Sequence, residues 1–238
     1  MRRIRLYVPT LTPGQVVLDG EEHTHLARVL RLKPGARVEL FDGAGRSSLG
    51  ELTRVERRQS EVLASEILVE PEPTWLLSAL VATPKGKRAR RLVEALTELG
   101  VDEITPLVTA RGEERPPRGS ELTRWTIEAS KQSGRNRLPR IGSPTSLQDL
   151  LTRLEAGGAM GLLPDTTSAP CLRDVLPEAP QSLVFVIGPE GGFTPEEREQ
   201  LAPALNPVSL GPSILRIETA AQALVGGVRA LWPSSQCT

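Results

Sequence analysis

Residues 186–197 read Val-Ile-Gly-Pro-Glu-Gly-Gly-Phe-Thr-Pro-Glu-Glu, and this stretch decides the fold class. An apolar strand ends at Gly188, and a glycine-rich turn follows it. Thr194, Pro195 and Glu197 then predict the N-cap, the first-turn proline and the capping box of a helix. An ordinary tight turn could share this pattern, because the stretch is neither G-x-G-x-x-G nor a Walker loop. A strand, a glycine turn and a helix in this order favour an open α/β sheet, which binds ligands at the carboxyl ends of its strands.

A second stretch of the same kind covers residues 210–221, which read Leu-Gly-Pro-Ser-Ile-Leu-Arg-Ile-Glu-Thr-Ala-Ala. Arg216 and Glu218 are charged residues beside an apolar segment, so they form either an internal ion pair or the polar groups of a site. Two such glycine-rich stretches after neighbouring strands would form one pocket.

From Trp75 onward the sequence alternates nearly continuous apolar strands with helical segments. Strands of this kind are typical of a parallel sheet that has helices on both faces. The predicted strands cover residues 75–82, 103–108, 159–163, 183–187 and 208–210, and the predicted helices cover residues 88–99, 122–133, 147–156, 195–201 and 219–231. This part of the chain is predicted to be an α/β domain.

The residues before this domain form short alternating strands separated by glycines. The predicted strands cover residues 4–8, 16–18, 37–41, 49–55 and 62–69, with one helix over residues 21–31. This pattern indicates a small β-barrel or sandwich. The Glu-Pro-Glu-Pro-Thr segment at residues 70–74 predicts a stiff, solvated connector. We therefore divide the chain into a first domain of residues 1–73 and a second domain of residues 74–238.

Basic residues gather in two places, although the formal net charge of the chain is zero. A run of charges is usually a solvated helix face. The first run, however, opens a predicted helix, where cations oppose the helix dipole and a negatively charged partner would relieve them. RNA phosphate is such a partner. The first run consists of Lys85, Lys87, Arg88, Arg90 and Arg91, and the second consists of Lys131, Arg135, Arg137 and Arg140.

Composition disfavours membrane proteins, zinc proteins and disulfide-framework proteins. No apolar stretch approaches the roughly 20 residues that a membrane-spanning helix needs, and the first residues do not resemble a signal peptide. Cys171 and Cys237 have no metal-like spacing, so we expect no disulfide framework, no metal and a cytoplasmic location. His23 and His25 lie far in sequence from the two glycine-rich stretches. We expect both to be structural histidines, with RNA contact by His25 as the second interpretation.

Five ordered blocks of sequence carry a resemblance to a known family. They are His25-Leu26 with Val29-Leu30-Arg31 and Phe41-Asp42-Gly43; Thr97-Glu98-Leu99-Gly100-Val101; Gln132-Ser133-Gly134-Arg135 with Pro139; Ile187-Gly188-Pro189-Glu190-Gly191-Gly192; and Ile214-Leu215-Arg216 with Glu218-Thr219-Ala220. With these blocks the chain resembles, nearly end to end, the RsmE family of small-subunit ribosomal RNA uridine N3-methyltransferases in the SPOUT superfamily.

The resemblance implies a small PUA-like RNA-binding β-barrel domain at the N-terminus. It also implies an α/β fold of the SPOUT type for the second domain, with a parallel sheet tied in a deep trefoil knot. The implied cofactor is S-adenosylmethionine, the implied assembly is a homodimer, and the implied substrate is 16S ribosomal RNA of the small ribosomal subunit. Methyl transfer to N3 of a specific uridine requires no metal, because loss of the N3 proton leaves a delocalised anion that can attack a sulfonium methyl.

The resemblance and the charge pattern together give a set of expected site residues. Residues expected to bind the cofactor are Leu162, Leu163, Pro164, Ile187, Gly188, Pro189, Glu190, Gly191, Gly192, Leu210, Gly211, Ile214 and Leu215. Residues expected to act in catalysis are Arg216, Glu190 and Arg111. Residues expected to bind RNA are Arg2, Arg3, His25, Arg28, Arg31, Lys85, Lys87, Arg88 and Arg135.

Two other classes of function stay open. A non-catalytic RNA-binding ribosome assembly factor would use the basic clusters and keep only a vestigial pocket. The two intact glycine-rich stretches disfavour this class. A nucleotide-dependent oxidoreductase would need a G-x-G-x-x-G turn after the first strand of the sheet, and residues 82–87 offer none.

Overall fold

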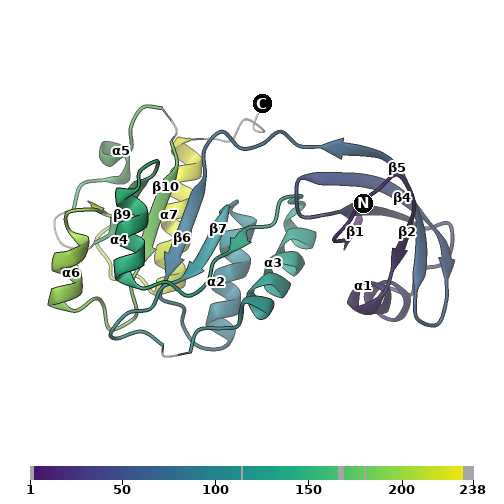
Figure 1. The fold of residues 1–238 in the computed structure, drawn as a ribbon, viewed down its shortest axis with the longest axis horizontal. Helices are drawn as coiled ribbons and strands as arrows, with labels where there is room; N and C mark the ends of the chain where they lie inside the picture. Colours follow the sequence, from purple (N-terminus) through teal and green to yellow (C-terminus); the bar gives the residue numbers. More distant parts are fainter. Residues whose placement is uncertain (1–2, 114, 166–168, 180, 233–238) are drawn as a thin grey trace. The chain divides into compact units, whose positions relative to one another are not determined.

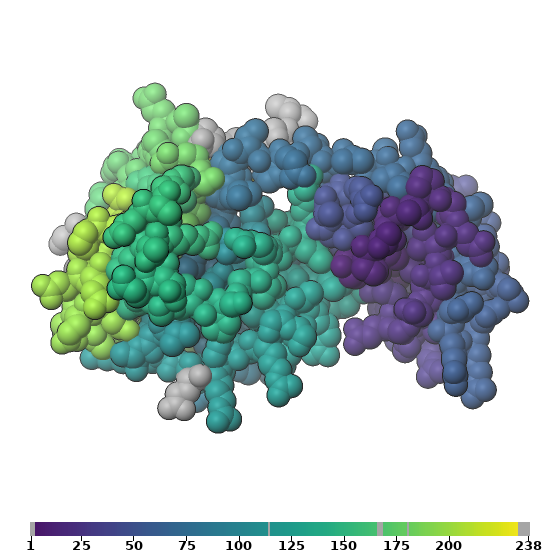
Figure 2. All heavy atoms as spheres, in the orientation of Figure 1, coloured from purple at the N-terminus to yellow at the C-terminus, as the bar shows by residue number. Residues whose placement is uncertain are grey.

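The computed structural model describes residues 3–113, 115–165, 169–179 and 181–232, and these form two compact units (Figure 1). The first unit contains Met1–Glu72 and Ile127–Leu138, and the second contains Pro73–Thr126 and Pro139–Thr238. In Figure 2 the atoms of residues 3–72 form one continuous mass, coloured purple to blue. A division at residue 73 alone would assign residues 127–138 to the second domain, whereas their contacts belong to the first unit.

The first unit is built on a five-stranded sheet with the order β1-β3-β4-β5-β2. Its strands are β1 (Ile4–Tyr7), β2 (Gly14–Leu18), β3 (Arg37–Phe41), β4 (Arg46–Val55) and β5 (Ser60–Val69). β1 pairs with β3 in parallel, and the other neighbouring strands are antiparallel. Leu6, Leu40, Leu52 and Val62 from these strands are fully buried in one apolar core. The alternating strand pattern of the sequence is therefore confirmed, although β4 begins earlier than predicted.

The helix predicted over residues 21–31 is in fact two short helices of different type. α1 (Gly20–Thr24) is an α-helix, and η1 (His25–Val29) continues it as a π-helix. His23 in α1 is buried, and its Nδ1 lies 2.8 Å from Oγ of Ser60. This contact confirms His23 as a structural histidine.

Two cations of the second basic run hold the first unit together. The ammonium of Lys131 is buried and pairs with the carboxylates of Glu22 and Glu128. Burial lowers the pKa of an ammonium, but these two carboxylates outweigh that effect and raise the pKa of Lys131. Nη1 of Arg137 lies 3.1 Å from Oε1 of Glu72. Residues 127–138 are thus attached to the first unit by ion pairs.

The second unit contains a six-stranded sheet with the order β11-β9-β10-β6-β7-β8. All of its neighbouring strands are parallel. Its strands are β6 (Leu77–Val81), β7 (Glu103–Pro106), β8 (Arg140–Ile141), β9 (Met160–Pro164), β10 (Leu183–Ile187) and β11 (Asn206–Val208). β6 and β10 are buried along their whole length, which explains their continuous apolar sequence. The predicted parallel α/β architecture is confirmed.

Helices cover both faces of this sheet (Figure 1). They are α2 (Lys87–Glu98), α3 (Gly119–Ser133), α4 (Leu147–Glu155), α5 (Leu172–Val175), α6 (Pro195–Leu201) and α7 (Ile217–Leu231). Phe185 of β10 packs in one core with residues of α2 and α7, whereas its neighbours Val184 and Val186 pack in another with residues of α4 and α6. Alternation along the strand thus gives each face its own core. In the part of the chain that is described, no helix has the length and apolar character needed to span a membrane.

Three short elements differ from the sequence prediction. The pattern does not predict β8 or α5, because segments of two and four residues are too short to show a periodicity. β11 covers Asn206–Val208 instead of residues 208–210. Pro207 lacks a backbone N–H, and β11 accommodates it because this strand lies at the edge of the sheet.

Glu103 joins three elements at the amino-terminal end of β7. Its carboxylate accepts hydrogen bonds from Arg140 Nη2 at 2.7 Å, from Arg153 Nη1 at 2.8 Å and Nη2 at 2.6 Å, and from Ser78 Oγ at 3.3 Å. Burial raises the pKa of this carboxyl, but the hydrogen bonds and charges of the two arginines outweigh it and lower the pKa. The charged form of Glu103 is therefore the form that stabilises the fold.

We expect Glu103→Gln to lower the free energy of unfolding by about 2 kcal/mol at pH 7, because two guanidinium groups lose a charged partner. A carboxyl with a lowered folded-state pKa stabilises the fold above its unfolded-state pKa, and this contribution is lost as the pH falls through the folded-state value. The difference from the wild type should therefore shrink as the pH falls below the ordinary value of 4.5. Urea denaturation at several pH values measures it. Glu155→Gln, at an exposed position of α4, is the control and should change stability by less than about 0.5 kcal/mol. A pH-independent difference would contradict the assignment.

Candidate functional site

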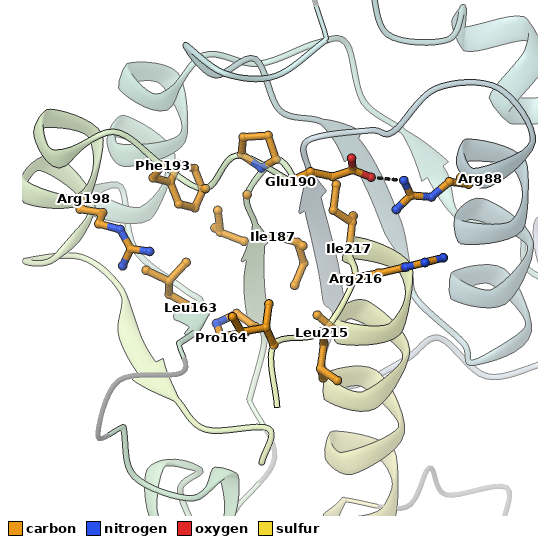
Figure 3. A pocket seen from close by; sticks show the side chains of 16 residues that line it. Arg88, Leu163, Pro164, Ile187, Glu190, Phe193, Arg198, Leu215, Arg216 and Ile217 are labelled. Atoms are coloured by element: carbon orange, nitrogen blue, oxygen red, sulfur yellow. Dashed lines mark hydrogen bonds and ion pairs between the residues drawn. The ribbon is translucent and has the colours of Figure 1, made fainter. Parts of the chain in front are cut away.

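A pocket of about 580 Å³ lies in the second unit at the carboxyl ends of its strands (Figure 3). Its walls come from the ends of β9 and β10, from the glycine-rich turn after β10, and from the segment that leads into α7. The lining residues are Arg88, Leu163, Pro164, Val186, Ile187, Gly188, Pro189, Glu190, Gly192, Phe193, Arg198, Ile214, Leu215, Arg216, Ile217 and Ala220. Across the described residues, no cluster of three or more His, Cys, Asp or Glu side chains is placed to hold a metal ion.

Both glycine-rich stretches that the sequence singles out contribute to this one pocket. The expected cofactor residues that line it are Leu163, Pro164, Ile187, Gly188, Pro189, Glu190, Gly192, Ile214 and Leu215. The two stretches meet in one pocket although the strands before them are not direct neighbours, because β9 lies between β10 and β11. β9 itself contributes the wall formed by Leu163 and Pro164.

Four other expected cofactor residues, Leu162, Gly191, Leu210 and Gly211, are not among the residues that line the pocket. Leu162 is fully buried in the apolar core, and Leu210 packs against that core. A Cβ added to Gly191 would lie 3.4 Å from Cδ of Arg111, so the open side of this glycine faces an arginine. Sequence spacing identifies the turn but does not show which way each of its residues points.

Sequence reasoning missed several lining residues. They are Val186, Phe193, Arg198, Ile217 and Ala220. Phe193 directly follows the turn, so its position in the sequence could have indicated it. Arg198 belongs to α6, the helix that follows the turn, and no sequence signal connects it with the pocket.

The helix after the glycine-rich turn holds the turn in place. Oγ1 of Thr194 accepts from N of Glu197 at 3.2 Å, and Oε2 of Glu197 accepts from N of Thr194 at 2.8 Å, which confirms the capping box. The second carboxylate oxygen of Glu197 accepts from N of Ala110 at 2.7 Å. Nη1 of the next residue, Arg111, donates to O of Gly191 at 2.9 Å. The loop after β7 is therefore bonded to α6 and to the turn, and Arg111 contacts the turn without lining the pocket.

Arg88 connects the two glycine-rich stretches (Figure 3). Its Nε and Nη2 donate to the carboxylate of Glu218 at 3.2 and 2.9 Å, and its Nη1 pairs with Glu190. Arg88 stands in the first turn of α2, where the helix dipole disfavours a cation, and the two carboxylates offset that cost. The hydrogen bond from Arg88 lowers the pKa of Glu218, and the hydrogen bonds with Glu218 and Glu190 raise that of Arg88. The guanidinium is thus a bridge across the pocket rim.

Two further arginines line the pocket, Arg198, which pairs with Asp165, and Arg216. Arg216 stands apart from the other two. Its guanidinium makes no hydrogen bond or ion pair with any residue that the structure describes, although its charge contributes to the lowered pKa of Glu218. The interpretation of Arg216 and Glu218 as an internal ion pair is therefore wrong, because Glu218 pairs with Arg88 instead. Arg216 remains as a polar group of the site.

The residues expected to bind RNA occur in both units. Arg2 lies outside the described residues. The exposed ones are Arg3, Arg28, Arg31, Lys85 and Lys87, and the half-buried ones are His25, Arg88 and Arg135. Nζ of Lys85 lies 2.8 Å from Oε2 of Glu113. Arg88 does not fit the expectation of a phosphate contact, because its guanidinium nitrogens already pair with the carboxylates of Glu190 and Glu218.

Comparison with known proteins identifies the family. Residues 70–229 match a family model described as an RNA methyltransferase domain, and residues 18–64 match one described as an RNA methyltransferase PUA domain. The ribosomal RNA small subunit methyltransferase E of Mycobacterium tuberculosis is 32% identical, with 96% of this chain and 93% of that protein covered. The chain belongs to the ribosomal RNA small subunit methyltransferase E family. The Rickettsia conorii member of that family is 30% identical, with 97% of each chain covered.

Solved structures of similar proteins share the fold of the methyltransferase E family. The Neisseria gonorrhoeae ribosomal RNA small subunit methyltransferase E, bound to S-adenosylmethionine, has a TM-score of 0.87 at 30% identity, covering 97% of this chain and 98% of that one. A Legionella pneumophila protein, also solved with S-adenosylmethionine, has a TM-score of 0.89 at 31% identity, with the same coverage. An α/β methyltransferase domain that follows a PUA domain is thereby confirmed. The knot stays a prediction.

We expect Arg88→Ala to loosen the pocket rim, because the two glycine-rich stretches lose their common ion-pair partner. Hydrogen exchange should become faster at the backbone amides of residues 188–192 and 216–219 in the full-length protein, with little change at the buried strand β6. Arg91→Ala, which removes an exposed arginine from the same helix, is the matched control. Equal exchange in both variants would show that the bridge does not order the rim.

Proposed function

We propose that this chain transfers a methyl group from S-adenosylmethionine to N3 of a specific uridine in 16S ribosomal RNA of the small ribosomal subunit. The observation that carries the proposal is the pocket in which two glycine-rich stretches meet under a rim of Arg88, Glu190 and Arg216. Membership of the family and the S-adenosylmethionine held by the similar structures support the same activity.

The residues present fit this cofactor. The pocket volume of about 580 Å³ lies in the range of small-molecule sites, roughly 300 to 1,000 Å³. Ile187, Leu215 and Ile217 offer apolar walls, and the turn from Gly188 offers backbone donors and acceptors. A Cβ at Gly192 would meet nothing within 4 Å, so this glycine leaves open space in the pocket wall. The lining residues that the two stretches and β9 contribute are the ones that would hold the cofactor.

When bound, S-adenosylmethionine supplies a methyl group on a positively charged sulfur. Uridine N3 carries its proton between two carbonyls, so the anion left by deprotonation is spread over N3 and the two carbonyl oxygens. Arg216 is permanently charged and lines the pocket, so it can stabilise that anion. Glu190 lines the pocket at the rim, and its carboxylate can accept the N3 proton once it leaves its ion pair with Arg88. Arg111 acts on the turn through the carbonyl of Gly191 and so positions the wall beside the acceptor.

The substrate base must leave its stack before it reaches the rim, because N3 is the pairing position of uridine. Extrusion of a base costs a few kcal/mol, which protein contacts to the flanking backbone must offset. The exposed cations of the chain, among them Arg3, Lys85 and Lys87, are the groups that can supply these phosphate contacts.

The decisive experiment offers the purified protein methyl-labelled S-adenosylmethionine with small-subunit ribosomal RNA or small subunits. We expect label in the RNA at one uridine, and a reverse-transcription stop there, because N3 methylation blocks base pairing. RNA binding without cofactor binding or methyl transfer would instead favour the non-catalytic assembly factor.

A glycine pair in the turn provides a matched test of the pocket. Gly192→Val should weaken S-adenosylmethionine binding at least about tenfold, since its side chain enters the open space and a β-branched residue is strained at φ +67°. Gly191→Ala should bind normally, because its methyl group would make an ordinary contact with Arg111. Calorimetry on folded variants measures both affinities. Loss of binding in Gly191→Ala with normal binding in Gly192→Val would contradict the pocket assignment.

A homodimer located in the cytoplasm completes the proposal. Ile214 at the pocket is 90% exposed, so apolar surface at the site is left uncovered in a single chain. Light scattering at micromolar concentration should give twice the mass of the chain. Ile214→Asp should shift the protein toward the monomer, and a monomeric wild type would contradict the proposal.

A further inference from the structure

Arg198 is a charged residue of the pocket to which the proposed methyl transfer gives no role. It belongs to α6, and its guanidinium group points from that helix toward the pocket (Figure 3). Phe193 and Leu163 lie beside it, whereas the charged rim lies on the opposite side of the pocket. The pocket therefore has one side with several charged groups and another on which a single arginine stands among apolar walls.

The helix α6 holds Arg198 in a fixed place at the pocket wall. N of Arg198 donates to O of Thr194 at 2.9 Å, and O of Arg198 accepts from N of Ala202 at 3.0 Å, so the residue lies within regular helix. Leu201 of the same helix is fully buried, and the capping box fixes the start of the helix. Helices position the side chains of a site more precisely than loops do.

Among the described residues, one carboxylate holds the guanidinium group of Arg198, and it does so weakly. Nη1 of Arg198 donates to Oδ2 of Asp165 at 3.4 Å, which is a long hydrogen bond. Asp165 directly follows β9, and its N donates to O of Val208 at 2.9 Å. Nε and Nη2 of Arg198 make no hydrogen bond with a residue that the structure describes. Arg198 thus keeps two donor groups and the flat face of its guanidinium group for a ligand.

A purely structural ion pair explains Arg198 poorly. Its side chain is 54% exposed, and an exposed pair with a long bond contributes little to the stability of a fold. The structural pairs of Glu103 are different, because that carboxylate is buried and meets two arginines at 2.6, 2.7 and 2.8 Å. The place of Arg198 in the pocket wall is therefore better explained by contact with a ligand.

The walls beside Arg198 suit a flat, uncharged ring. Phe193 is buried, and a Cβ added to Gly188 would lie 2.6 Å from Cε2 of Phe193, so the aromatic ring packs directly on the glycine-rich turn. Leu163 and Pro164 form the neighbouring wall at the end of β9. Apolar walls with few polar groups favour an aromatic heterocycle over a charged amino-acid group, whose desolvation is costly.

The carboxylate next to Arg198 also favours a neutral partner. Asp165 offsets much of the positive charge of Arg198, and a ligand carboxylate bound to this guanidinium group would lie near the carboxylate of Asp165. Like charges at short distance repel each other strongly in a pocket. In S-adenosylmethionine the adenosine half is uncharged at neutral pH, whereas the methionine half carries a carboxylate, an ammonium and the sulfonium. The adenosine half therefore fits the side of Arg198, and the methionine half fits the charged rim.

We propose that Arg198 recognises the adenosine half of S-adenosylmethionine, by donating hydrogen bonds to acceptor atoms of the nucleoside. The inference rests on the proposed function, because it takes S-adenosylmethionine as the ligand, and it adds a residue that determines specificity. A guanidinium group suits this role, since it offers several donors in one plane and stacks on aromatic rings. With the adenosine on this side, the sulfonium methyl faces the rim, where Glu190 and Arg216 meet the uridine.

Two ligands separate the halves of the cofactor in the full-length protein. Methylthioadenosine keeps the adenosine but lacks the amino-acid group of S-adenosylmethionine. Arg198→Met should weaken the binding of both ligands by the same factor, roughly tenfold, because both lose the same hydrogen bonds from a charged donor. Arg198→Lys keeps a cation beside Asp165 but loses the planar fork, so it should lose nearly as much affinity for both ligands. Calorimetry measures the affinities.

A control variant and two further measurements complete the test. Arg173→Met, at an exposed position of α5, is the matched control and should bind both ligands like the wild type. The melting temperature of each variant without ligand should change by less than about 3 °C, because the ion pair of Arg198 is exposed. In the methyl-transfer assay Arg198→Met should raise the KM for S-adenosylmethionine and leave kcat nearly unchanged, since Arg198 contacts neither the methyl group nor the acceptor.

Each outcome has a defined meaning. Weaker binding of S-adenosylmethionine with unchanged binding of methylthioadenosine would assign Arg198 to the methionine half and overturn the inference. Unchanged affinity for both ligands in Arg198→Met and Arg198→Lys, with methyl transfer intact, would also overturn it and leave the proposed function in place. A wild type that binds both ligands, with the expected losses in the variants, but methylates no ribosomal RNA would refute the proposed function alone.

Discussion

The parallel pairing of β6 with β10 is the constraint on which the site depends. The two strands run in register from Leu77 beside Leu183 to Val81 beside Ile187, and N of Ala82 extends the ladder by donating to O of Ile187 at 2.9 Å. Both strands are fully buried, so their chain direction and register are set by two apolar cores rather than by the polar residues that follow them. Because parallel strands end at one edge, the residues after them meet there, and a pocket can form from segments distant in sequence.

The sequence predicts the position of the pocket better than its electrostatics. The glycine turn and the capping box of Thr194 and Glu197 are local patterns, in which all partners lie within a few residues. The bridge at Arg88 joins residues 102 and 130 positions away from it, and no spacing rule connects them. The helix dipole disfavours a basic residue at a helix N-terminus, so the sequence suggests a phosphate group as its partner. A carboxylate of the same chain offsets the unfavourable interaction equally well. The same limit explains why Glu197 could be predicted as a cap but not as the acceptor for Ala110.

The division of the chain shows a related limit. The Pro-rich connector correctly marks where the strand pattern changes, since that signal is local composition. Residues 127–138 join the first unit through contacts such as Arg5 Nη1 to Ser130 O at 2.8 Å, across 125 positions. Arg5 and Lys131 are buried cations, and burial of a charge is stabilising only when its partners are present. Removal of residues 1–73 would therefore take away Arg5 and Glu22 and leave Lys131 without its buried carboxylate, so a fragment cut there is not a clean second domain.

A chain with zero net charge can still bind a polyanion if its charges are unevenly neutralised. Fields between exposed charges are screened over about 8 Å at physiological salt, so RNA responds to local clusters rather than to the sum over the chain. Most described cations in the second basic run and at the pocket rim are paired with carboxylates, and their contribution to that local field is small. The carboxylates that neutralise them are among the 29 acidic residues that balance the 29 basic residues of the whole chain. Exposed arginines that pair with no carboxylate of the described residues, among them Arg3 and Arg216, keep a charge that an RNA phosphate or a uracil anion can meet. An overall neutral sequence can act on a highly charged substrate in this way.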